Sequence, residues 1–318
     1  MICQYTPVRK SPIVCNRLAL VSICLLQSGF GQVKVENAGA AEKLIDPAAK
    51  VEKLAGGMKF IEGPVWISEK KTLIFSDIPN SVLMQWNKEG GLKEYRKTQA
   101  ANGNTLDLNG QIVSCQHTGR NIVREEKDGT ISVVISAFDG KKFNSPNDLA
   151  IKTDGSIWFT DPPYGTPKGE AKELEGNWVY RFVPETKATT VVSKEFNMPN
   201  GIVFSPDEKR LYIADSGKPG RVGAFDVKSD GTLSAAIWWA DGGADGIRVD
   251  ALGNLYTTAA DGVRIYSPEG KKIATIEVPE VPANLEFGGD DRKTLFITAR
   301  TSLYSVPMKV AGAVRPKK

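Results

Sequence analysis

The feature that most constrains the fold is a pattern that recurs six times along the chain. Each copy has a polar residue, a short strand of alternating apolar residues, a turn rich in Asp, Asn and Gly, and a second strand of β-branched and aromatic residues. The copies begin at Glu62, Asn104, Asn147, Asn200, Asp245 and Asn284. Successive starts are 39 to 53 residues apart, which suits one four-stranded propeller blade per repeat.

Six repeats predict an all-β fold, a six-bladed β-propeller with four-stranded antiparallel blades around a central channel. No segment has a sustained helical period, so we expect few helices. The stretch from Val51 to Leu54 precedes the first copy and is expected to add the outer strand of the last blade, which closes the ring. We therefore expect one propeller domain at 51–310, with a linker at 32–50 and a tail at 311–318.

Residues 1–31 have the order of an export signal peptide. Three basic residues precede an apolar run from Leu18 to Leu26, and small residues follow it. The run is shorter than the roughly 20 residues of a membrane span. We expect an exported protein, periplasmic or secreted, without stable membrane insertion; a disordered start or a misassigned start codon is the alternative. Cys115 would be the one cysteine of the mature chain, which leaves no intramolecular disulfide.

The charge balance disfavours a nucleic-acid partner. The formal net charge of +4 falls to +1 when the three basic residues of the signal segment are removed. A surface that binds nucleic acid needs a much stronger basic excess. We therefore expect a small uncharged or acidic ligand.

The six repeat starts share one chemistry, since all are carboxylates or carboxamides. Inner strands of a propeller begin near one mouth of the channel, so these side chains are expected to converge there. Oxygen ligands of this kind suit calcium, with magnesium, manganese or zinc as alternatives. A structural zinc site has few ligands here, because His117 is the one histidine. Any single Asn or Asp could instead cap its own turn.

Five short motifs carry a family resemblance. They are Glu62-Gly63-Pro64-Val65-Trp66, Asn144-Ser145-Pro146-Asn147-Asp148, Phe159-Thr160-Asp161-Pro162-Pro163-Tyr164-Gly165, Pro199-Asn200-Gly201 and Asp245-Gly246. In order and spacing they resemble the gluconolactonase family, which includes senescence marker protein (regucalcin) and bacterial sugar lactonases. The resemblance runs from about Gly57 to Val306.

The resemblance implies a metal-dependent hydrolase that opens a sugar lactone to the aldonic acid. It implies that Glu62, Asn200 and Asp245 bind the metal, with Asn147 as a further ligand or substrate contact. Asp245 is also the family's suspected general base, although a metal-bound carboxylate is a weak base. Regucalcin-like members have an arginine where this chain has Ser145-Pro146, so the bacterial lactonases are the nearer match.

Four further residues are candidate substrate contacts. Asn104 and Asn284 are proposed from their repeat positions. His117 invites a proton-transfer role, or is a buried histidine satisfied by a backbone carbonyl. Tyr164 is expected to stack on or hydrogen-bond to the sugar, unless its loop is only a turn stiffened by two prolines.

Three alternatives stay open at this stage. The same metal site could hydrolyse another ester or an organophosphate, the propeller could bind a protein or glycan without catalysis, or a calcium ion in the channel could be structural. The sequence also leaves open which lactone and which metal are used, and the oligomeric state.

Overall fold

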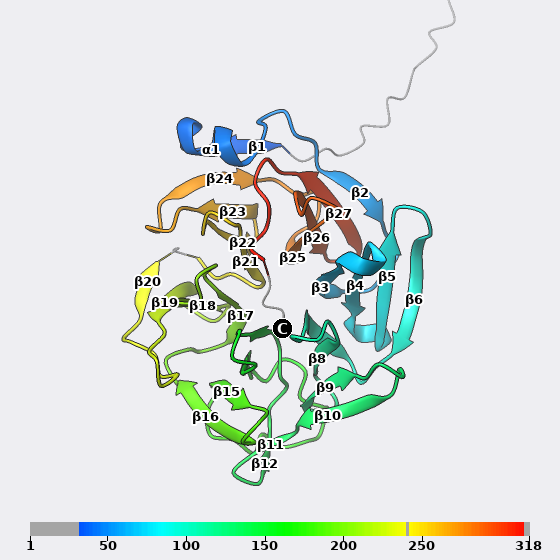
Figure 1. The fold of residues 1–318 in the computed structure, drawn as a ribbon, viewed down its shortest axis with the longest axis vertical. Helices are drawn as coiled ribbons and strands as arrows, with labels where there is room; N and C mark the ends of the chain where they lie inside the picture. The colour runs from blue at the N-terminus through cyan, green and yellow to red at the C-terminus, as the bar shows by residue number, and fades with distance from the viewer. Residues whose placement is uncertain (1–31, 240–241, 315–318) are drawn as a thin grey trace, which may run out of the picture.

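The computed structural model describes residues 32–239 and 242–314. In this part of the chain, six antiparallel sheets surround a central channel as the blades of a propeller (Figure 1). In each blade the first of the consecutive strands lies innermost. Figure 1 shows β3, β17, β21 and β25 nearest the centre and β6, β10 and β16 at the periphery. The predicted fold class is confirmed.

The blades follow one another in sequence, and their strands are as follows. The first has β3 (Ile61–Ile67), β4 (Thr72–Asp77), β5 (Val82–Asn87) and β6 (Gly91–Lys97). The second has β7 (Ala101–Leu106), β8 (Ile112–Gln116), β9 (Asn121–Glu125) and β10 (Ile131–Ile135). The third has β13 (Leu149–Ile151), β14 (Ile157–Thr160), β15 (Val179–Val183) and β16 (Ala188–Ser193). The fourth has β17 (Pro199–Phe204), β18 (Arg210–Asp215), β19 (Arg221–Asp226) and β20 (Ile237–Trp239). The fifth has β21 (Ile247–Val249), β22 (Leu255–Ala259), β23 (Gly262–Tyr266) and β24 (Lys272–Ile276). The sixth has β25 (Pro282–Gly288), β26 (Thr294–Ala299) and β27 (Ser302–Pro307). The pair β11 (Ala137–Phe138) and β12 (Lys141–Lys142) forms a small separate hairpin.

The ring closes as the sequence predicts. Strand β2 (Glu52–Ala55) pairs antiparallel with β27, with Glu52 opposite Ser305, and so completes the sixth blade. Apolar packing reinforces the closure, because Trp66 of the first blade stacks on Phe296 of the sixth with ring centroids 5.4 Å apart. An N-terminal strand in a C-terminal blade leaves no open edge between the two ends of the ring.

Residues 32–50, expected as a linker, contain ordered elements. Strand β1 (Val33–Val35) adds a fifth strand to the fifth blade by pairing with β24. Helix α1 (Ala38–Leu44) begins at Asn37, whose side chain accepts a bond from the Ala40 N–H. Ala41, Leu44 and Ile45 are fully buried against the fifth and sixth blades. Two 3₁₀ turns, Ser68–Lys70 and Ile78–Asn80, are the other helical segments described. Residues 1–31, expected as an export signal, lie outside the described residues.

Three aspartates at the ends of second strands hold the loops that lead into the innermost strands. The Asp77 carboxylate accepts bonds from the N–H groups of Lys59 and Phe60 at 3.3 Å. Asp161 does the same for Asn144 and Ser145 at 2.8 Å. Asp215 accepts from Asn197 and Met198 at 3.0 and 2.9 Å. Each loop is therefore fixed just before the residue that enters the channel.

The last described residues of the chain contact the end of innermost strand β21. The Ala313 N–H donates to the Val249 carbonyl, and Gly312 bridges to Asp250. Residues 311–314, expected as a tail, therefore contact the fifth blade.

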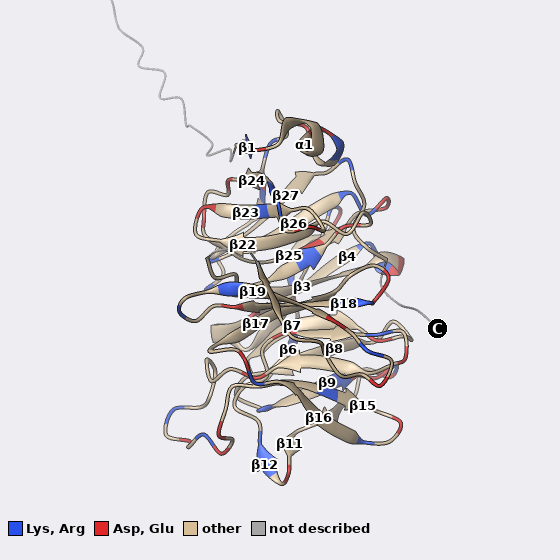
Figure 2. Cartoon of the chain, turned by 90° about the vertical axis from the view of Figure 1, so that its left-hand side faces the viewer, with Lys and Arg blue, Asp and Glu red and all other residues tan. Residues whose placement is uncertain are grey.

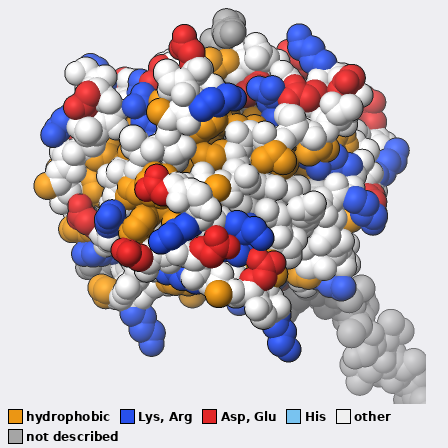
Figure 3. Space-filling view, turned by 90° about the horizontal axis from the view of Figure 1, so that it is seen from below, with side chains coloured by type: hydrophobic (Ala, Val, Ile, Leu, Met, Phe, Trp, Pro, Cys, Tyr) orange, Lys and Arg blue, Asp and Glu red, His pale blue; other side chains and the backbone are white. Residues whose placement is uncertain are grey.

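Acidic and basic residues are interspersed along the ribbon in Figure 2 and over the face shown in Figure 3. Among the described residues, no helix has the length and apolar character needed to cross a membrane.

Candidate functional site

The register of the innermost strands defines which residue of each blade enters the channel. In four blades the pairing between the innermost and second strands begins with Ile61 opposite Asp77, Ala101 opposite Gln116, Pro199 opposite Asp215 and Pro282 opposite Ala299. A bulge follows each of these pairs or begins at it, and bulges beside functional sites re-aim side chains. The residues at the equivalent position, which we call the ring residues, are Glu62, Asn102, Asn147, Asn200, Asp245 and Ala283.

Glycine after a ring residue allows neighbouring blades to approach closely. A Cβ atom on Gly63 would lie 2.0 Å from the Asn102 carbonyl oxygen, and one on Gly201 would lie 2.5 Å from the Asp245 carbonyl oxygen. The Gly201 N–H instead donates to that Asp245 carbonyl at 2.9 Å. This backbone bond between the fourth and fifth blades fixes Asn200 relative to Asp245.

One pocket of about 430 Å³ collects most of the predicted site residues. Its lining includes four predicted metal ligands, Glu62, Asn147, Asn200 and Asp245, together with His117 and Tyr164. Asn102, which the sequence analysis missed, also lines it. The sequence signal was available, because Asn102-Gly103 repeats the pattern of Asn200-Gly201 and Asp245-Gly246.

Asn104 and Asn284, the other two expected substrate contacts, are both buried. Asn104 is fully buried, donates to the Gly63 carbonyl at 2.7 Å and accepts from the Ser114 hydroxyl at 2.6 Å. Its amide therefore joins two blades. Asn284 lies one residue beyond the ring position, accepts a bond from the Leu285 N–H and contacts the Glu62 side chain. Neither residue is among those that line the pocket.

Two carboxylates in the ring perturb each other. Burial, followed by the charge of Asp245, raises the pKa of Glu62 well above its usual range. Burial also raises the pKa of Asp245 to about 7, with a further contribution from the charge of Asp148. The Asn200 and Glu62 side chains both hydrogen-bond to Asp245. Carboxyl groups this close cannot both ionise cheaply unless positive charge lies between them.

His117 is held as a neutral imidazole. It is 6% exposed, and burial lowers the pKa of its side chain to about 4. The Asn102 amide nitrogen lies 3.0 Å from its Nε2 atom. Because an amide nitrogen can only donate, Nε2 accepts and the ring proton lies on Nδ1. His117 therefore fixes the orientation of Asn102, a partner different from the backbone carbonyl considered above.

Tyr164 lies on a loop over the pocket and is 46% exposed. Its side chain hydrogen-bonds with Ser216 and Asn200. Arg120, which is 3% exposed, donates to Glu170 of this loop at 2.8 Å and to the Phe143 carbonyl of the segment before β13 at 2.6 Å, and so joins the two segments. The loop is therefore more than a turn stiffened by prolines.

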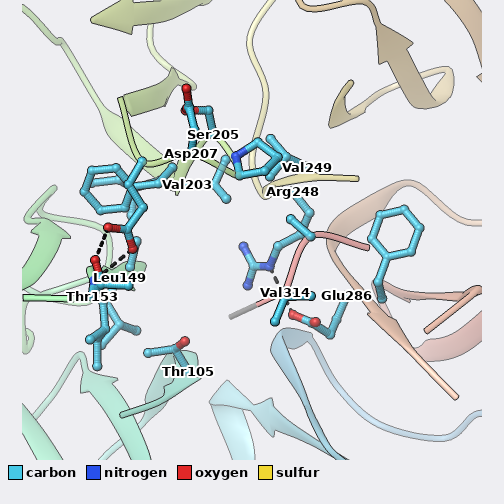
Figure 4. Close-up of a pocket in the computed structure, with 18 of the residues that line it drawn as sticks. Thr105, Leu149, Thr153, Val203, Ser205, Asp207, Arg248, Val249, Glu286 and Val314 are labelled. Atoms are coloured by element: carbon cyan, nitrogen blue, oxygen red, sulfur yellow. Dashed lines mark hydrogen bonds and ion pairs between the residues drawn. The ribbon is translucent and has the colours of Figure 1, made fainter. Parts of the chain in front are cut away.

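A buried charge cluster lies in the channel on the other side of the ring. Arg248 lies 3.2 Å from Glu286 and 3.5 Å from Asp148. A second pocket opens beyond this cluster, and Figure 4 shows Arg248 and Glu286 in it with Val314 nearby. Arg248 thus separates the ring pocket from the opposite mouth.

The ring fits a hard divalent cation. Two carboxylates and up to three carboxamides face one pocket, and these oxygen donors are the ligands that calcium accepts in proteins. A cation among them would also stabilise both ionised carboxylates, which burial and mutual repulsion now disfavour. Glu62, Asn147, Asn200 and Asp245 are the pocket residues whose side-chain oxygens could bind such a cation.

Comparisons with known proteins show to which family the chain belongs. The family model described as SMP-30/Gluconolactonase/LRE-like region matches residues 60–301. A gluconolactonase from Zymomonas mobilis is 28% identical, and the alignment covers 85% of each chain. The solved structure of a gluconolactonase from Xanthomonas campestris is 31% identical, with a TM-score of 0.81 and coverage of 87% of this chain and 95% of that one. A calcium-binding protein, regucalcin from Agrobacterium tumefaciens, is 20% identical with a TM-score of 0.70 over 83% of this chain and 97% of that one, which shows the shared fold alone. The chain therefore belongs to the SMP-30/gluconolactonase/LRE-like family.

Proposed function

We propose that this protein is a lactone hydrolase that opens a sugar lactone of the gluconolactone type and depends on a divalent cation, with calcium as the first candidate. The observation that carries the proposal is the ring, where Glu62 and Asp245 face one pocket together with three carboxamides. Lactone hydrolysis is supported by the gluconolactonases of Zymomonas and Xanthomonas among its relatives. The oxygen donors of the ring support the choice of cation, because carboxylate and carboxamide oxygens are ligands that calcium accepts.

The residues that line the pocket have different roles in the proposed hydrolysis of the lactone. When bound by Glu62, Asn147, Asn200 and Asp245, a divalent cation supplies Lewis-acid polarisation of the lactone carbonyl. Asp245 is partly accessible from the pocket, and in this proposal its carboxylate holds the attacking water and takes its proton. Asn102, oriented by His117, presents its amide oxygen to a substrate hydroxyl or to the water. Tyr164 covers the pocket and contributes a ring face and a hydroxyl.

The test is substitution of the central carboxylate. Asp245→Asn keeps the shape of the side chain and removes its charge, so hydrolysis of glucono-1,5-lactone in a pH-stat should fall by about a thousandfold or more. Asp290→Asn is the matched control, because that side chain is 73% exposed and lies far from the ring in the turn after β25. Its rate should match the wild type. Full activity of the Asp245 variant would show that the assigned chemistry is wrong.

We also propose that residues 1–31 direct export to the periplasm or the medium. Their basic residues and short apolar run support this proposal. Mass spectrometry of the protein expressed in a bacterial host should give a mature N-terminus near residue 31. An intact N-terminus in the cytoplasmic fraction would contradict it.

A further inference from the structure

The ring pocket has one polar half and one apolar half. The polar half comes from the second, third and fourth blades and contains Asn102, His117, Asn147, Tyr164, Asn200 and Ser216. The apolar half comes from the fifth, sixth and first blades, which also supply Glu62, Asp245 and Thr258 to the lining, and it contains Phe60, Ile78, Ala259, Ala260, Val281 and Pro282. We call this second set the apolar wall.

The apolar wall arises from equivalent positions in the blades. The residue after the second strand is His117 or Ser216 in two polar blades, but Ile78 or Ala260 in two apolar ones. Two residues before the ring position, Phe60 of the first blade and Val281 of the sixth line the pocket, whereas Ala100 and Met198 of the second and fourth blades do not. The sixth blade also has Ala283 where the other five have a carboxylate or carboxamide. The apolar residues that line the pocket therefore lie on three neighbouring blades, and the guanidinium of Arg300, which follows the second strand of the sixth blade, lies 6.0 Å from the centre of the Phe60 ring.

The apolar wall is available to a ligand. Val281 is 41% exposed, and Phe60 and Ile78 are partly exposed at the pocket surface. The Ile78 N–H donates to the Phe60 carbonyl at 3.1 Å, which holds these two residues together. A fully hydroxylated sugar ring can hydrogen-bond with the polar half but leaves this wall without a hydrophobic partner. Apolar surface that lines a pocket with convergent polar groups is typical of a site for a ligand with both characters.

We infer that the pocket takes, besides a sugar lactone, lactones that carry an alkyl or aryl substituent, with the substituent on the apolar wall and the ring ester at the carboxylates. This inference rests on lactone hydrolysis but not on a sugar as the substrate. Water adds to the carbonyl carbon and the bond from that carbon to the ring oxygen breaks. The ring oxygen leaves as a hydroxyl with one proton of the water, and the product is a hydroxy acid. The Ile78–Val281 side favours the apolar substituent, since each methylene removed from water is worth about fourfold in binding.

The experiment compares δ-valerolactone with δ-decalactone, the same ring with a pentyl substituent. The ratio of their kcat/KM values is corrected for the ratio of their hydroxide-catalysed rates. For the wild type, the corrected ratio should favour δ-decalactone by about tenfold or more, because two or three methylenes reach the wall. Val281→Asn and Ile78→Asn should each lower that ratio severalfold and change kcat/KM for δ-valerolactone by less than about twofold. Neither residue belongs to the ring.

Leu252→Asn is the matched control, because Leu252 is an apolar residue 61% exposed in the turn between β21 and β22. It should leave the ratio unchanged. A wild-type ratio near one, or a high ratio that both wall variants retain, would overturn the inference while lactone hydrolysis stands. Failure to hydrolyse either lactone and glucono-1,5-lactone as well would instead overturn the proposed function, and this inference with it.

Discussion

At the scale of single residues, Asn102 and Asn104 have opposite roles although they are two positions apart. Asn102 lines the pocket and bonds to His117, whereas Asn104 joins Gly63, Ser76 and Ser114 inside the protein. Asn102→Ala should lower kcat/KM for a lactone by about tenfold, the worth of a hydrogen bond at the site. Asn104→Ala should lower the free energy of unfolding by about 2 kcal/mol, because buried partners lose their bonds.

Urea denaturation and steady-state kinetics on both variants check this assignment. Asn104→Ala should keep the kcat/KM of the wild type at a temperature where it is folded. An Asn104 variant that is stable but impaired in KM would return that residue to the substrate site.

His117 gives a prediction about acid stability. The folded protein holds this imidazole neutral with a pKa of about 4, against 6.5 for an ordinary histidine. Between these values the unfolded chain binds more protons than the folded one, so stability falls as the pH drops from 6.5 towards 4. Between pH 7 and 5 the wild type should lose about 2 kcal/mol more than His117→Gln. Equal pH dependence of the two proteins in urea titrations would contradict the neutral assignment.

The repeat pattern in the sequence identified four of the six ring positions as the structure has them. The repeat pattern correctly indicated Glu62, Asn147, Asn200 and Asp245 as residues of one pocket. It misplaced the second and sixth ring positions, because a bulge shifts the register between Ala101 and Asn104 and between Pro282 and Asn284. Alternation of apolar residues does not reveal a bulge.

At the scale of the elements, the contact between the first and sixth blades is the seam of the ring. Phe296 stacks on Trp66, lies 5.6 Å from the Trp86 ring and is 3% exposed. Phe296→Ala should lower the free energy of unfolding by about 4 kcal/mol, from lost burial and the cavity left behind. Val133→Ala is the control, since Val133 lies on outer strand β10 and is 58% exposed. Its effect should stay within about 0.5 kcal/mol. Equal effects of the two changes in urea titrations would mean that the seam adds little stability.

The elements differ in how well sequence predicts them. Strand β2 was expected near Val51 because a ring of repeats needs one more strand to close. Helix α1 was not expected, since seven residues are too few to show a helical period. Its burial depends on the contact of Ala41, Leu44 and Ile45 with the fifth and sixth blades, which are far from the helix in sequence. Such a contact cannot be inferred from local pattern.

At the scale of the whole molecule, the number of repeats was enough to predict the six blades and the channel. The division of the pocket into polar and apolar halves was not predictable, because it depends on which residues of different blades meet at one mouth. The same holds for the Arg248, Glu286 and Asp148 cluster, which joins three blades across the channel. Position within a repeat is visible in sequence, whereas contact between repeats is a property of the closed ring.

The closed ring also links cation binding to stability. A cation that binds the ring of the folded protein and not the unfolded chain should add about 2.7 kcal/mol at a hundred times its Kd. Differential scanning calorimetry of wild type and Asp245→Asn, with and without calcium, measures this gain. It should be present in the wild type and largely lost in the variant.

The most direct test of the central claim is lactone hydrolysis by protein stripped of metal and then reconstituted. The account predicts that chelator-treated wild type has negligible activity against glucono-1,5-lactone and that added calcium, or another divalent cation, restores it. A treated sample, shown by elemental analysis to contain no metal, that still hydrolyses the lactone at the full rate would contradict a metal-dependent ring centred on Glu62 and Asp245.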